Sequence, residues 1–152
     1  MTWGLLLVLA LLWPLPFVSA DYQSIQVGGR VQCDSNVEAL KSVLFELIDK
    51  PRAFTFSKAT TMAQSFGVPS ADGTFNLQGY ATSHFANIRP YLIIEHSCGT
   101  KAKSCRKIWE YKLPAKYIDA GAYNLGTVNL SLSSCSKVAS SDTKCWTETE
   151  KC

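Results

Sequence analysis

The sequence predicts an all-β domain, a disulfide-stabilised β-sandwich of about seven to eight strands. In several short segments apolar residues alternate with polar ones, which is the period of a strand with one buried face. Residues that favour turns separate these segments. The six cysteines are Cys33, Cys98, Cys105, Cys135, Cys145 and Cys152. An even number of cysteines in a secreted chain indicates up to three disulfides.

The first 20 residues predict a signal peptide. They contain no charged residue, and the run at 5–12 is apolar throughout. The sequence VSA at 18–20 supplies the small residues that signal peptidase prefers. Two prolines interrupt the segment, whereas a membrane-spanning helix needs about 20 apolar residues in succession. We therefore expect a secreted, extracellular protein that does not span a membrane.

The rest of the chain is long enough to form one domain with its own core. The net charge of +3 at pH 7 is far from the strongly basic balance of nucleic-acid-binding domains, so we expect no nucleic-acid partner. Residues 21–131 carry the alternating segments and form the predicted sandwich. Residues 132–152 are rich in Ser, Thr and Cys. They predict a tail that is fastened by disulfides instead of by packing.

The first two strands are predicted at 24–33 and 42–49. In SIQVGGRVQC, one face is apolar and the pair Gly28-Gly29 predicts a bulge or a close backbone approach. SVLFELID repeats the alternation. The inward-facing residues are Ile25, Val27, Val31 and Cys33 in the first segment, and Val43, Phe45 and Leu47 in the second. Residues 49–63 are less regular, and both a loop and a short helical turn remain open there.

The clearest turn is Asp72-Gly73, because glycine accepts a positive φ and the alternation resumes directly behind it in TFNLQG. A strand is predicted in RPYLIIEHSC, where Pro90 stands at the start and its missing N–H costs little. Two more strands are predicted in CRKIWEYKLP and YNLGTVNLSL, and Pro114 ends the first of them.

The ordered motifs GGRVQC, DGTFNLQG, IRPYLIIEHSC, CRKIWEYKLP and YNLGTVNLS resemble those of the nematode transthyretin-like family. The resemblance extends over about residues 24–131. It implies a secreted sandwich of the transthyretin-like (prealbumin-like) type. It also implies a non-enzymatic extracellular protein with a binding or bridging role.

Two alternative functions belong to the same fold. Hydroxyisourate hydrolases depend on several histidines, an arginine and a C-terminal Tyr-Arg-Gly-Ser motif. This chain has two histidines, His84 and His96, and ends in Glu150-Lys151-Cys152. Carriers of small hydrophobic ligands bind them at the centre of a tetramer, and the residues of such a site are not recognisable here. We therefore expect no enzymatic activity, no catalytic residue and no cofactor.

The segment EHSCGTKAKSC combines His96 with Cys98 and Cys105. Structural zinc sites use four ligands with cysteines about two to four residues apart, and thiols of a secreted chain oxidise. We therefore predict no metal site, and a Cys98–Cys105 disulfide that closes a hairpin. Alternation turns His96 inward, which predicts a half-buried, hydrogen-bonded histidine.

The pairing of the other four cysteines is more open. Cys33 ends the first strand on its inward face, so we expect it to join the tail through Cys135 or Cys145. The two remaining tail cysteines, one of them Cys152, would then pair. Six cysteines allow 15 connectivities, and the sequence does not select one.

Lys101, Lys103, Arg106 and Lys107 form a cationic cluster with no acidic residue at 97–109. One interpretation is a binding patch for an anionic lipid or glycan surface, or for the acidic face of an extracellular protein. The other interpretation is a solvated hairpin tip.

Asn129-Leu130-Ser131 is the one N-x-S/T sequon of the chain, which makes Asn129 a candidate glycosylation site. If Val128 and Leu130 face inward, Asn129 faces outward, where a glycan can be attached.

Overall fold

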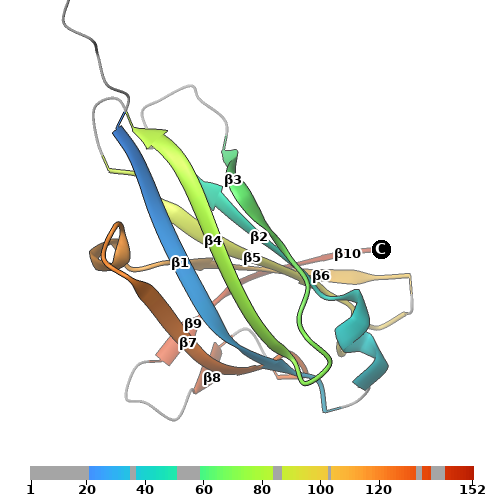
Figure 1. Cartoon of the computed structure of the whole chain (residues 1–152). Coiled ribbons are helices and arrows are strands. Elements are labelled where there is room, and N and C mark those ends of the chain that lie inside the picture. Colours follow the sequence, from blue (N-terminus) through green and yellow to red (C-terminus); the bar gives the residue numbers. More distant parts are fainter. Residues whose placement is uncertain are drawn as a thin grey trace, which may run out of the picture.

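A computed structural model describes residues 21–34, 37–50, 59–83, 87–102, 104–132, 135–137 and 143–152. The predicted signal peptide lies outside these residues. The described part contains ten strands and two short 3-10 helices (Figure 1). The strands are β1 (Asp21–Gln32), β2 (Leu44–Asp49), β3 (Thr60–Gly67), β4 (Thr74–Ser83), β5 (Pro90–His96), β6 (Arg106–Lys112), β7 (Ala122–Asn129), β8 (Cys135–Lys137), β9 (Thr143–Cys145) and β10 (Thr147–Lys151). The helices are η2 (Val37–Ser42) and η3 (Ala115–Tyr117).

Eight strands form one sheet in the order β10-β6-β5-β2-β3-β4-β1-β7, and β8 pairs with β9 separately. β3 pairs with β2 on one side and meets β4 at Ala63 and Tyr80 on the other. The sheet turns over at β3, so that β1, β4 and β7 lie across from β2, β5 and β6 (Figure 1). The predicted all-β sandwich is confirmed.

The core lies between these two layers. Its fully buried side chains include Trp109, Leu92, Ile94, Leu47 and Leu125. Every second residue of β5 is buried, which is the period expected for a strand with one face on the core. The rings of Phe45 in β2 and Phe75 in β4 stack at 4.3 Å and join the two layers directly.

Glycine is required at two predicted places. At Gly29, an added Cβ would lie 2.8 Å from the Gly126 carbonyl oxygen, and the β1–β7 register shifts between Gly28 and Arg30. Gly73 has φ +85°, a conformation that glycine adopts without steric cost. Beside it, Asp72 Oδ1 accepts hydrogen bonds from the backbone N and the Oγ1 of Thr74, which lower the pKa of Asp72.

The segment that the sequence left open contains the start of β3 at Thr60, and residues 51–58 lie outside the described part. The short helix η2 was not predicted. It ends where Ser42 Oγ donates to the Ala39 carbonyl and the Val43 N–H bonds to the Leu40 carbonyl.

The C-terminal residues pack on the sandwich, contrary to the predicted tail. β10 pairs with β6 from Thr147 opposite Glu110 to Lys151 opposite Arg106. Trp146 is 4% exposed and joins the core beside Tyr111. The prediction of fastening without packing is therefore wrong for 146–151. β10 is exposed on both faces, so it lacks the alternation that reveals a strand in the sequence, and its backbone hydrogen bonds hold it.

The disulfides also differ from the predictions. Cys33 pairs with Cys98, and Cys105 pairs with Cys152. The predicted Cys98–Cys105 bond is wrong, as are the predicted links from Cys33 to the tail and from Cys152 to another tail cysteine. The β5–β6 ladder stops at His96 and Lys107. Beyond that point Cys98 lies against Cys33 at the end of β1, across the core. Cys105 instead lies next to Arg106, which pairs with Lys151 of β10, and so it reaches Cys152.

Candidate binding surfaces

An apolar groove opens on the outer face of β2, β3 and β5. It encloses about 330 Å³ and is lined mainly by Leu44, Glu46, Phe66, Val68, Ile93 and Glu95. Three of these apolar side chains are well exposed, Leu44 by 47%, Phe66 by 70% and Val68 by 64%. Grouped exposed apolar side chains of this kind mark interaction sites more often than scattered ones do.

The end of β3 shapes this groove. Phe45 of β2 stands opposite Gly67 of β3, and the pairing of the two strands shifts register between Glu46 and Ile48. A Cβ at position 67 would meet Leu77 Cδ2 at 2.4 Å. Glycine therefore lets β3 lie directly on the core at this point, while the neighbouring side chain of Phe66 stands outside.

Two carboxylates stand at the groove and differ in their partners. Glu95 Oε1 forms an ion pair with Arg106 Nε at 2.5 Å. Glu46 Oε1 accepts a hydrogen bond from the neutral Thr61 hydroxyl at 2.5 Å. Among the described residues Glu46 has no basic partner. Within the described part of the chain the groove is therefore apolar with one carboxylate, Glu46, that has no basic partner.

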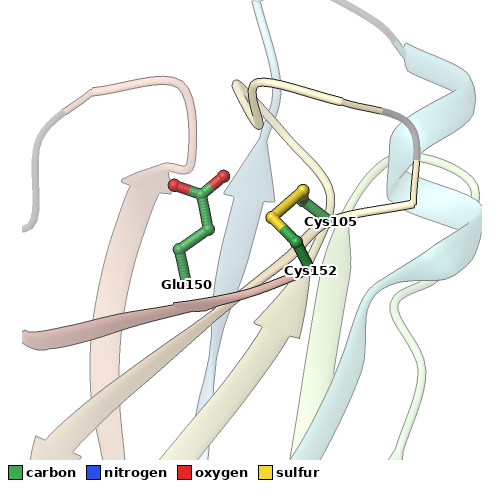
Figure 2. Close-up of side chains that lie close together, drawn as sticks. All are labelled: Cys105, Glu150 and Cys152. Carbon is green, nitrogen blue, oxygen red and sulfur yellow. A yellow bond between two sulfur atoms is a disulfide. The ribbon is translucent and has the colours of Figure 1, made fainter.

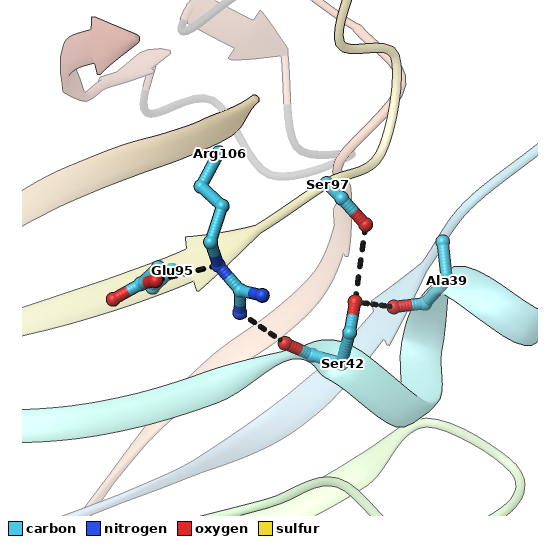
Figure 3. A network of polar contacts seen from close by, with 5 residues as sticks. All are labelled: Ala39, Ser42, Glu95, Ser97 and Arg106. Atoms are coloured by element: carbon cyan, nitrogen blue, oxygen red, sulfur yellow. Dashed lines mark hydrogen bonds and ion pairs between the residues drawn. The ribbon is translucent and has the colours of Figure 1, made fainter. Parts of the chain in front are cut away.

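A polar network fixes η2 against the sheet next to the groove (Figure 3). Arg106 Nη2 donates to the Ser42 carbonyl at 2.6 Å. The hydroxyls of Ser42 and Ser97 share a hydrogen bond at 3.0 Å. Arg106 therefore links Glu95 at the wall of the groove to the end of η2.

A second hollow of about 340 Å³ adjoins the first and shares Val68 with it. Glu38, Leu40 and Lys41 of η2 and the segment Pro69–Ala71 complete its lining. The exposed apolar surface therefore extends from β5 across the end of β3 to η2.

The predicted cationic cluster does not form a patch of free charges. Arg106 is paired with Glu95, and Lys107 Nζ lies 3.5 Å from Glu148 Oε1 with its side chain 15% exposed. Lys101 is exposed, and Lys103 lies outside the described residues. The prediction counted acidic residues only along the local sequence, whereas Glu95 and Glu148 come from neighbouring strands.

His96 faces inward, as the alternation predicted, but it is completely buried. Its ring meets Trp109 edge-on at 5.0 Å. Neither ring nitrogen has a hydrogen-bond partner of normal geometry among the described residues, contrary to the prediction. Burial, reinforced by the charge of Lys107, lowers the pKa of His96 to about 4, although the backbone of Cys98 acts in the opposite direction.

Cys105, Glu150 and Cys152 bring two sulfur atoms and a carboxylate within 4.8 Å of one another (Figure 2). The two sulfurs are bonded to each other. Metal ions bind thiolates, which a disulfide does not offer. This cluster therefore closes the end of β10 and offers no metal-binding set while it is oxidised.

Asn129 lies on the outward side of β7, between the buried residues Val128 and Leu130. Its Nδ2 donates to Asp34 Oδ2 at 2.5 Å, and its Oδ1 accepts from the Ser131 N–H at 2.9 Å. Glycosylation at Asn129 stays a prediction.

Residues 28–114 match the family model of the Transthyretin-like family. The chain belongs to the Transthyretin-like family. It is similar to Transthyretin-like protein 2 of Caenorhabditis elegans, with 27% identity over 115 residues that cover 71% of this chain and 75% of that protein. The resemblance drawn from the motifs is thus confirmed. The family match ends before β7 and β10, so both lie outside the matched residues.

Sequence reasoning did not find the groove of this transthyretin-like chain. Phe66 and Val68 lie between the irregular segment 49–63 and the Asp72-Gly73 turn, where no strand was predicted. The indication that was present is the apolar run FGV directly before Pro69 and the Asp72-Gly73 turn. No helix in the described part of the chain combines the length and the apolar character needed to cross a bilayer.

Proposed function

We propose that this protein is a secreted, non-enzymatic binding protein that docks an extracellular partner protein in the groove of β2, β3 and β5. The observation that carries the proposal is the group Leu44, Phe66 and Val68 beside the uncompensated carboxylate of Glu46. The two disulfides support secretion, because disulfides persist in oxidising compartments.

The chemistry of the groove selects the occupant. Apolar side chains that fill a small pocket supply most of the binding energy of a protein interface. A negative charge at its edge favours a positive charge on the partner and disfavours anionic phosphate groups. We therefore expect a segment that presents an aliphatic or aromatic residue next to Lys or Arg.

A binding role fits the environment of His96 better than a catalytic role does. A general base must reach the proton that it removes. His96 is inaccessible to solvent, and its lowered pKa keeps it neutral at physiological pH.

Selection of displayed random peptides on the folded, disulfide-intact protein tests the proposal. We expect enrichment of peptides that carry a basic residue beside an apolar one. Phe66→Ser should lower the affinity for the selected peptides at least tenfold, which corresponds to about 1.4 kcal/mol. Glu46→Gln should weaken them less and reduce the dependence of binding on salt.

Tyr22→Ser is the matched control, because Tyr22 is 73% exposed and lies on β1. It should leave binding unchanged. Enrichment of acidic peptides, or binding that survives Phe66→Ser, would contradict the groove as the docking site.

A further inference from the structure

The layer of β1, β4 and β7 presents a nearly uncharged polar surface. These strands contain only two charged residues, Asp21 and Arg30. The recommended composition of a soluble designed surface is about 25–35% charged residues. The outward-facing side chains are instead amides and hydroxyls, among them Ser24, Gln26, Asn76, Gln78, Asn124 and Thr127.

A polar pocket of about 290 Å³ lies on this surface. Ser24 and Gln26 of β1, Gln78 of β4, Tyr117 of η3 and the segment 119–121 form its walls. It lies on β1 and β4, whereas the apolar groove lies on β2, β3 and β5.

The wall made by Asp119 is held in place by several bonds to one residue. Asp119 Oδ1 accepts from the Ser24 N–H at 2.7 Å and from Ser24 Oγ at 2.9 Å. The Asp119 N–H donates to the Ser24 carbonyl at 3.0 Å. Asp119 also has φ +54°, a left-handed conformation that few non-glycine residues adopt. A pocket with a fixed wall loses little entropy when it binds a ligand.

Hydrogen-bonding capacity is left over inside the pocket. Gln26 Nε2 donates to Asn76 Oδ1 at 3.2 Å, which leaves Gln26 Oε1 and a second N–H for a ligand. The amide of Gln78 has no partner among the described residues. Each amide offers donors and an acceptor side by side, and Tyr117 adds an aromatic ring with a hydroxyl.

This arrangement disfavours anionic and apolar ligands. The pocket lining contains no Lys or Arg that could bind an anion. Arg30 Nε donates to the Asp72 carbonyl at 2.8 Å, and Lys116 Nζ lies over the Tyr117 ring at 5.2 Å from its centroid. The polar walls do not suit an apolar ligand. Protein interfaces favour aromatic residues, Met and Arg, whereas amides predominate here. A ligand with many neutral hydroxyl groups matches the donors and acceptors.

We propose that this pocket, with the amides of Gln26 and Gln78, binds a neutral oligosaccharide. The protein then has a second binding site on a different face from the groove. An extracellular protein with two such sites can hold a glycan and a partner protein together.

Nitrogen-15 NMR of the oxidised protein tests this site directly. Tetrasaccharides of glucose, mannose and N-acetylglucosamine are titrated in turn, with a sulfated heparin tetrasaccharide for comparison. We expect at least one neutral sugar to shift the side-chain amide signals of Gln26, Asn76 and Gln78 saturably. No shift with any neutral sugar, or shifts with the sulfated sugar alone, would overturn the proposal.

Variants confirm the position of the site. Gln26→Ala and Gln78→Ala should each lower the affinity for the sugar at least tenfold, while the backbone spectrum keeps its dispersion. Gln32→Ala is the matched control, because Gln32 is an exposed amide of β1 outside the pocket, and it should change nothing. Sugar binding should also survive Phe66→Ser, which separates this site from the groove. Unchanged affinity in both pocket variants would overturn the proposal.

Discussion

Strands β1, β4 and β7 carry two charged residues, whereas β2, β5, β6 and β10 together carry ten. Both layers bury the same kind of apolar side chain in one core. Their outer faces differ in the contacts that join neighbouring strands. In the charged layer these are ion pairs, such as Arg106 with Glu95 and Lys107 with Glu148. The neutral layer uses amide contacts such as Gln26 with Asn76. One core therefore supports two outer surfaces of different chemistry.

The layers also differ in how they are completed. The outer edge of β6 is covered by β10, which the Cys105–Cys152 bond fastens at the end of the chain. The Cys33–Cys98 bond instead joins β1 of the neutral layer to β5 of the charged layer. The first disulfide secures an edge, and the second one connects the two layers.

Removing the connecting disulfide should have the largest effect. The loop between Cys33 and Cys98 spans 65 residues, and the chain-entropy model assigns such a loop about 4 kcal/mol. Replacing both cysteines with Ala should lower the free energy of unfolding by about that amount. Urea unfolding of the oxidised protein measures it.

Replacing Cys105 and Cys152 with Ser is the comparison. The loop closed by this bond is 47 residues long. Without the bond, the exposed β10 can separate while the two layers stay folded. The free energy of unfolding should therefore fall by about 2 kcal/mol. Amide exchange should accelerate at 147–151 first. A larger drop in the free energy of unfolding for this variant than for the Cys33 and Cys98 variant would contradict these roles, in which one disulfide secures an edge strand and the other connects the two layers.

The packing of the C-terminal residues provides the second prediction. Trp146 contacts Tyr111 at 4.8 Å and Trp109 at 5.7 Å between ring centroids. Trp146→Ala should cost about 3 kcal/mol because it leaves a cavity in the core, again measured by urea unfolding. Trp146→Phe should cost less than about 1.5 kcal/mol, since the indole N–H has no partner to lose among the described residues.

Thr147→Ala is the control for this experiment. Thr147 is exposed and stands opposite Glu110 in the ladder, so its loss should be small. Equal stability of Trp146→Ala and Thr147→Ala would show that the tail is fastened without packing, as the sequence alone predicted.

The sequence was sufficient for the fold because the local period of two is strong in the core strands. Ile25, Val27, Val31, Phe45 and Leu47 were all predicted to face inward and are all buried. The glycine positions of the β1 bulge and of the Asp72-Gly73 turn were also predictable. A close approach of two backbone segments or a positive φ requires glycine, so such positions can be recognised in the sequence.

The disulfides and the candidate sites depend on contacts between distant strands. The partner of Cys98 is set by where β1 ends across the core, and the partners of Arg106 and Lys107 are set by which strands flank β6. β10 carries little alternation because both of its faces are exposed. These properties follow from sheet order, which the spacing of residues along the chain does not encode.

The last prediction concerns His96, the buried histidine of the charged layer. The pKa of His96 falls from 6.5 to about 4 on folding, so the unfolded chain binds a proton more readily than the folded chain does. The stability due to neutral His96 is therefore complete above about pH 6.5 and is lost as the pH falls toward 4. Between pH 7 and pH 5 the free energy of unfolding should drop by about 2 kcal/mol.

Comparison with His96→Leu isolates this contribution. Leu is apolar and fits a site whose two ring nitrogens make no hydrogen bond of normal geometry, so the variant should fold and lose that pH dependence. Thr74 holds the pKa of Asp72 below 3.8, so Asp72 titrates below this range in both proteins. Urea unfolding at pH 7, 6 and 5 measures the difference. Parallel curves for the two proteins would show that His96 reaches a proton in the folded state, and that the core of the charged layer is open to water there.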